Sequence, residues 1–94
     1  MTDELQPKHL THHHRETVER LFAHPTLHNI TWREVHSLLE AIGDVEERHD
    51  DRFHVVIGES SHVIARPRQK DIPVDMVLEL RGLLRSGGYE PPVS

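Results

Sequence analysis

The segment DRFHVVIGESSHVIARPRQK, residues 51–70, decides the fold. Its first half, RFHVVI, is rich in β-branched and aromatic residues, which favour a strand. Gly58-Glu59-Ser60 is a turn sequence, and SHVIAR predicts a strand that returns antiparallel to the first. Pro67 cannot donate to a strand ladder, so the pairing ends there. The segment therefore predicts a β-hairpin followed by a basic loop.

The length of the turn determines which side chains share a face of this hairpin. Side chains alternate along a strand, and a shift of one residue moves each of them to the other face. With three residues in the turn, His62 and Arg66 face the same side as His54. With two residues, His62 joins Phe53 on the opposite face. The sequence leaves both registers open.

Three helices are predicted around the hairpin. HHHRETVERLF carries an apolar stripe at helical spacing and predicts a helix over about 12–23. TWRE is a capping-box pattern followed by apolar residues at helical spacing, which predicts a helix over about 32–42. A third helix is expected over about 73–86, where Pro73 suits the first turn and a Gly-Gly pair ends the apolar face.

The order of the elements predicts the fold class. Residues 44–50 are polar with one valine and are expected to form a short edge strand. The order is then α-α-β-β-β-α, an α+β fold with helices on one face of an antiparallel sheet. The 94 residues make a single domain. We expect a flexible tail over 1–10, an N-terminal helical extension over 11–30, a core over 31–88 and a second tail over 89–94.

The composition limits the classes of function. The chain has no cysteine, which excludes disulfides, thiolate catalysis and cysteine zinc sites and suits a reducing cytoplasm. No apolar run approaches the roughly 18 residues of a membrane span, and the first residues do not resemble a signal peptide. The net charge of −5, with histidines neutral, disfavours a generally basic nucleic-acid binder. The acids concentrate between Glu40 and Asp51, however, and RPRQK at 66–70 is a local basic run.

Histidine is the unusual residue of this composition, with ten copies. Free histidine titrates near pH 6.5, so partial protonation near pH 6 would offset much of the negative charge. The HHH run at 12–14 leads directly into a helix, and Pro25 between His24 and His28 prevents a helical metal-binding pair. No Gly-rich phosphate loop is present. We therefore expect neither a metal nor a cofactor.

Several segments resemble the HicA family of bacterial toxins. TWREVHSLLEAIG is similar to the family's first helix, RFHVVIG and SSHVIARPR to its second and third strands, and IPVDMVLELRGLLRSGG to its last helix. The resemblance covers about 31–88, and the preceding HHHRETVERLFAHPTLHNITW resembles the N-terminal extension of a longer subgroup. It implies a double-stranded-RNA-binding-like α-β-β-β-α domain that cleaves mRNA and pairs with a HicB antitoxin.

The chain departs from the family at the catalytic motif. The family's catalytic histidine lies in a Gly-Ser-His motif at the start of the second strand. That position reads Asp50-Asp51-Arg52 here or, shifted by two residues, Arg52-Phe53-His54. The first alignment places Arg52 at the catalytic position, and the second places His54 there without its Gly-Ser. A shift of two residues keeps the same face of a strand, so His54 lies on the catalytic face in both alignments.

Under this resemblance the chain would be a metal-independent endoribonuclease. Such an enzyme needs a base, an acid and cations that bind phosphate. His54 could serve as base or acid, and Arg52 could bind a phosphate from the same face. We therefore predict His54 as the catalytic residue. The predicted RNA- and phosphate-binding residues are Arg52, His62, Arg66, Arg68 and Lys70.

Two other functions remain open. A non-catalytic module of the same fold could bind RNA by its shape and backbone, for which a few basic residues suffice. The acidic net charge and the missing motif favour this alternative. A protein-binding adaptor would make no RNA contact at all. The simpler alternatives without a function are that His54 is a solvent-facing strand residue and that the basic run is a solvated loop. Trp32 is expected to pack in the protein rather than to stack on a base.

Overall fold

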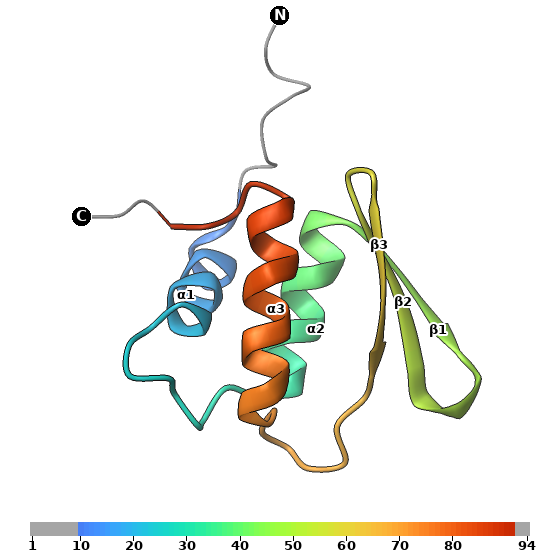
Figure 1. Ribbon diagram of the computed structural model, residues 1–94, viewed down its shortest axis with the longest axis horizontal. Helices are drawn as coiled ribbons and strands as arrows, with labels where there is room; N and C mark the ends of the chain where they lie inside the picture. The colour runs from blue at the N-terminus through green and yellow to red at the C-terminus, as the bar shows by residue number, and fades with distance from the viewer. Residues whose placement is uncertain (1–9, 92–94) are drawn as a thin grey trace, which may run out of the picture.

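The computed structural model describes residues 10–91, which form three helices and a three-stranded antiparallel sheet (Figure 1). The helices are α1 (His12–Leu21), α2 (Trp32–Ile42) and α3 (Val74–Ser86). The strands are β1 (Asp44–Arg48), β2 (Arg52–Ile57) and β3 (Ser60–Ala65), and a one-turn helix, η2 (His49–Asp51), joins β1 to β2. The α+β class and the predicted order of helices and strands are confirmed, but the strand expected over 44–50 ends at Arg48, and His49 and Asp50 belong to η2. Most of the expected tail over 1–10, and residues 92–94 of the second tail, lie outside the described residues.

Polar caps begin the first two helices. The hydroxyl of Thr11, the N-cap of α1, accepts a hydrogen bond from the His14 N–H, and α1 starts at His12. At α2 the predicted capping box is complete, because the Thr31 hydroxyl accepts from the Glu34 N–H and the Glu34 carboxylate accepts from the Thr31 N–H. These caps satisfy amide groups that a helix leaves unpaired in its first turn.

Two helix limits differ from the prediction. The first helix ends at Leu21 rather than near residue 23, because the Ala23 N–H turns to the Arg20 carbonyl, three residues back. Pro73 precedes α3 as its N-cap instead of lying in its first turn. The first difference lies in the last turn of α1 and the second at the start of α3, and helix ends are the least regular part of a helix.

The turn between β2 and β3 contains two residues, Gly58 and Glu59, because Ile57 pairs with Ser60. This register places His62 opposite Val55, and Val63 opposite His54. Directly opposed residues of an antiparallel pair point to the same face. Of the two registers that the sequence allowed, the structure therefore has the one that separates His62 from His54.

The helices cover only one face of the sheet. In Figure 1, α2 and α3 lie against the sheet and α1 lies on their other side, away from the sheet, so the outer face of the sheet carries no helix. The inner face supplies buried apolar side chains that pack on the helices: Phe53, Val55, Ile57 and Ile64. No helix within residues 10–91 has the length and apolar character that a membrane crossing requires.

The N-terminal extension belongs to the core rather than being appended to it. Leu21 and Ile30 are fully buried. Arg81 of α3 is itself buried and donates to the Leu21 carbonyl at 2.6 Å and to the Ala23 carbonyl at 2.9 Å. The end of α1 is thereby attached to the last helix, so the extension and the expected core over 31–88 share one hydrophobic interior.

The residues that follow α3 remain in contact with the core and with this helix. Tyr89 packs against the core, and its N–H donates to the Leu84 carbonyl at 2.8 Å. Arg85 forms an ion pair with Glu90 at 3.1 Å. The first residues of the segment that we expected to be a tail, 89–94, are therefore held against α3.

Candidate nucleic-acid interface

The basic loop at 66–70 is anchored beside the N-terminus of α2. An isolated antiparallel bridge pairs Thr31 with Asp71. The Trp32 N–H donates to the Lys70 carbonyl at 3.0 Å, and the Ile72 N–H donates to the Ile30 carbonyl at 2.8 Å. These backbone bonds hold the loop across the start of the helix. Two segments that are separated in the sequence by the rest of α2 and by all three strands therefore meet there.

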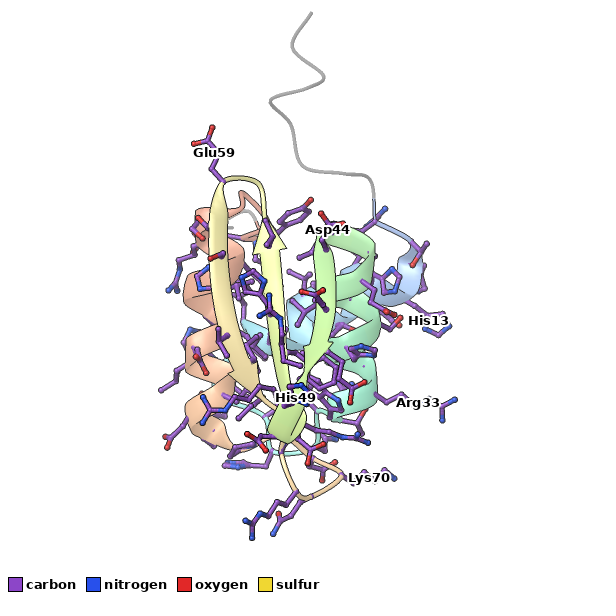
Figure 2. All side chains as sticks on the ribbon, turned by 90° about the vertical axis from the view of Figure 1, so that its right-hand side faces the viewer. His13, Arg33, Asp44, His49, Glu59 and Lys70 are labelled. Carbon is purple, nitrogen blue, oxygen red and sulfur yellow. The ribbon has the colours of Figure 1, made fainter. Side chains whose placement is uncertain are left out.

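This meeting forms a basic hollow. Its cationic side chains are Arg33, Arg66, Arg68 and Lys70, and its other lining residues are Thr31, Trp32, Pro67 and Gln69. All four cations are exposed, and none of them forms an ion pair with another residue of 10–91. Figure 2 shows the side chains of Arg33 and Lys70 extending outward from this end of the molecule. The partial positive charge of the α2 N-terminus adds to the attraction for an anion.

Arg33 is the member of the basic hollow that the sequence analysis missed. It stands on α2, whereas the three predicted cations follow β3. Its place at the second position of a capped helix was visible in the sequence. The backbone bridge that brings the loop to that helix was not, so no sequence signal linked the two.

A second hollow lies on the outer face of the sheet, the face turned to the viewer in Figure 2. It is lined by Arg48, His49, Arg52, His54 and Val63. The pairing explains the group, because Arg48 lies opposite Arg52 and His54 lies opposite Val63. The predicted residues Arg52 and His54 therefore do share a face. His49, on η2, is a second histidine in this outer hollow that the sequence analysis did not single out.

His54 contacts a cation. The Arg48 guanidinium lies 3.3 Å from Nδ1 of His54 and also bonds the Glu46 carboxylate at 2.9 Å. A guanidinium only donates, so this contact is a hydrogen bond when Nδ1 carries no proton. The proton of the neutral ring is then on Nε2. In this arrangement His54 offers an N–H donor at Nε2, which suits a phosphate contact. A general acid would need the ring protonated at both nitrogens, and its Nδ1 could then not accept from Arg48.

The backbone between β1 and β2 joins the outer hollow to the basic hollow. Asp50 and Asp51 both have left-handed φ angles, 64° and 58°. The Asp51 carbonyl accepts from the Arg66 N–H at 2.8 Å, which holds the start of the basic loop against the hairpin. Neither aspartate forms an ion pair with Arg52 in the described part of the chain.

Two candidate residues lie away from these hollows. His62 is half-buried on the inner face of β3, and its Nε2 atom is buried without a hydrogen-bond partner among residues 10–91. Trp32 is 9% exposed, and its ring packs on His36 and Phe53 at centroid distances of 5.7 and 5.2 Å. Trp32 therefore packs in the core, as expected, and offers no exposed ring face for a base. The structure thus does not bring His62 to the same surface as Arg52 and His54.

Comparison of the chain with protein-family models, with curated proteins and with solved structures finds no match. Within residues 10–91 no three or more His, Asp or Glu side chains are grouped so that they could hold a metal ion. The functional argument therefore depends on the two hollows and on the residues that line them.

Proposed function

We propose that this chain is a HicA-like toxin component that binds RNA in the cytoplasm through the basic hollow. The observation that carries the proposal is the meeting of Arg66, Arg68 and Lys70 with Arg33 at the N-terminus of α2. The chain has a net charge of −5, yet these four cations are exposed and unpaired with residues of 10–91. Phosphate contacts supply most of the affinity in such complexes.

The fold is compatible with the proposed family. From α2 onward the order α2-β1-β2-β3-α3 is the α-β-β-β-α order of a double-stranded-RNA-binding-like domain, and α1 is the additional helix. A HicB-like antitoxin would neutralise the toxin by covering the surface that carries the two hollows. The adjacent positions of the hollows favour this arrangement, since one partner could cover both.

The outer hollow carries the proposed cleavage. Arg48 and Arg52 would bind the scissile phosphate. His49 would take the proton of the ribose 2′-OH, and the 2′-oxygen would attack the phosphorus. His54, protonated at both ring nitrogens once Arg48 has turned from Nδ1 to the phosphate, would give its Nε2 proton to the leaving 5′-oxygen, and the products would be a 2′,3′-cyclic phosphate and a 5′-hydroxyl. The contact with Arg48 places the proton of the neutral His54 ring on Nε2, and the acid role requires Arg48 to leave Nδ1 so that the ring can take a second proton.

The second candidate is an RNA-binding module of the same fold that does not cleave. The left-handed backbone at Asp50 favours it. Glycine adopts this conformation without strain, so the backbone suits the alignment of Asp50-Asp51-Arg52 with the family's Gly-Ser-His. Arg52 then occupies the position of the catalytic histidine, and a guanidinium does not act as a base.

Binding and cleavage of a labelled RNA, with EDTA present, between pH 6 and pH 8 test both candidates. The variants are His54→Ala, the double variant Arg33→Gln/Arg68→Gln, and Arg15→Gln as a matched control, since Arg15 is an exposed cation on α1 that lines neither hollow. Cleavage by the wild type that is lost in His54→Ala supports the enzyme. Salt-dependent binding without cleavage, lost only in the double variant, supports the module. A wild-type chain that shows no salt-dependent RNA binding would contradict both.

A further inference from the structure

The two edges of the sheet differ in charge. β1 carries Asp44, Glu46, Glu47 and Arg48 among its five residues, whereas β3, with the sequence SSHVIA, contains no Asp, Glu, Lys or Arg. Charged side chains on an edge strand oppose the addition of a further strand. The free edge of β1 is therefore protected in the way that is usual for monomeric sheets, and the free edge of β3 is not.

The unprotected edge also exposes an apolar side chain. Val63, in the middle of β3, is 56% exposed. The other exposed large apolar residue of the described chain is Leu78 on α3, at 51%. β3 pairs with β2 alone among residues 10–91, so half of its backbone hydrogen-bonding groups point to an edge without a strand. In Figure 2, β3 forms one margin of the sheet and β1 the other.

We infer that β3 pairs antiparallel with β3 of a second copy of this chain, which joins the two sheets into one of six strands. The occupant follows from self-complementarity. A two-fold axis through Val63 places Val63 of one copy opposite Val63 of the other. It also places Ser61 opposite Ala65 and His62 opposite Ile64, so that no Asp, Glu, Lys or Arg lies at any of these positions.

The charges that flank β3 are compatible with the same register. Ser60 of one copy lies opposite Arg66 of the other, and Glu59 in the turn comes opposite Pro67, so no like charges oppose each other along this edge. Each copy has a net charge of −5, so two copies repel one another over most of their surfaces. The β3 edge combines backbone pairing with an absence of opposed like charges.

The two-fold axis is perpendicular to the sheet, because antiparallel pairing of one strand with its own copy requires it. Both helical layers then lie on the same side of the joined sheet. The helix α3 lies behind β3 (Figure 2), so the two α3 helices become neighbours in the second layer. Both outer faces point the other way, and the outer hollows of the two copies, with His54 opposite Val63, remain open on one common surface.

Sedimentation of the full chain over a range of concentrations tests this inference with two matched variants. Val63→Lys and Leu78→Lys each replace an exposed large apolar side chain by a cation. We expect dimers of the wild type and of Leu78→Lys. In Val63→Lys two lysines oppose each other across the axis, and the dissociation constant of the dimer should rise roughly tenfold or more.

A crosslink tests the register and does not depend on the lysine variants. The chain has no cysteine, so Val63→Cys introduces a single thiol. Opposed residues of an antiparallel pair have Cα atoms about 4.5–5.5 Å apart, within the range of a disulfide. We expect Val63→Cys to form a covalent dimer on mild oxidation and Leu78→Cys to form little. A wild type that stays monomeric at the highest concentration reached, or a dimer that Val63→Lys leaves unchanged, would overturn the inference. The inference would also be overturned if the chain stayed monomeric and its β3 edge paired only with a strand of a different protein.

Discussion

The guanidinium of Arg20 on α1 contacts the carboxylate of Glu34 in the first turn of α2. The other oxygen of that carboxylate accepts hydrogen bonds from the N–H and hydroxyl of Thr31, at 2.9 and 3.0 Å. Partial burial would raise the pKa of Glu34, but the bonds from Thr31 and the charge of Arg20 outweigh it and hold the pKa below its usual value. The Glu34 carboxylate thus links the N-terminal extension to α2, whose first residues line the basic hollow.

Glu34→Gln should change how stability depends on pH. The folded state holds the pKa of Glu34 below its unfolded value, so the stabilisation is present above the unfolded pKa and is lost as pH falls through the folded pKa. We expect the difference in Tm between wild type and Glu34→Gln to be largest at neutral pH and to shrink below about pH 4. Thermal unfolding between pH 2 and pH 7 measures it. Glu19→Gln, at an exposed position of α1, is the control, and a difference that is the same at every pH would contradict the prediction.

Arg81→Met should destabilise the fold. The Arg81 guanidinium is buried and donates to the Leu21 and Ala23 carbonyls and to the Thr26 hydroxyl. Methionine leaves these acceptors without that donor, and we expect a loss of about 2–4 kcal/mol in the free energy of unfolding. Arg85→Met is the matched control on the same helix. Its exposed ion pair with Glu90 should contribute about 1 kcal/mol or less. Urea unfolding measures the free energy of unfolding of both variants. An equal decrease in both would show that the buried hydrogen bonds of Arg81 stabilise the fold no more than the exposed ion pair does.

Asp50→Gly should stabilise the fold. The left-handed backbone costs a non-glycine residue about 1–2 kcal/mol, and the greater freedom of glycine in the unfolded chain returns part of this. We expect a net gain of about 0.5–1 kcal/mol in the free energy of unfolding. Gly58→Ala is the reciprocal variant, because Gly58 has a φ of +60° and an added Cβ would meet no atom within 4 Å. It should lose about 1 kcal/mol. Loss of stability in Asp50→Gly would indicate that the Asp50 side chain stabilises the turn.

Arg33→Gln should reduce the salt dependence of RNA binding. Each phosphate contact that is removed lowers the slope of log K against log salt by about 0.7 for a single strand. We expect that change for Arg33→Gln and for Arg68→Gln, and none for Arg15→Gln, which lies outside the basic hollow. Titrations of a labelled RNA at several salt concentrations measure the slopes. If the slopes of all three variants were equal, Arg33 would make no phosphate contact beyond that of the control Arg15.

The secondary structure was predictable because its signals are local. The Thr31 to Glu34 capping box, the apolar spacing of the three helices and the β-branched run before Gly58 all act within a few residues. The same reasoning placed Arg52 and His54 on one face, since alternation along a single strand is local as well. The limits of two helices and of the first strand differed by one or two residues, and η2 was not predicted.

The composition of the hollows depended on contacts between distant segments. The backbone bridge from Thr31 to Asp71 added Arg33 to the basic loop, and η2 added His49 to the outer hollow. A turn of two residues moved His62 to the inner face. Local pattern sets which residues form a helix or strand, because propensity and capping energies act over one turn or one pleat. Register, loop docking and the choice of free edge follow from the packing of the whole chain, which decided which of the predicted residues meet.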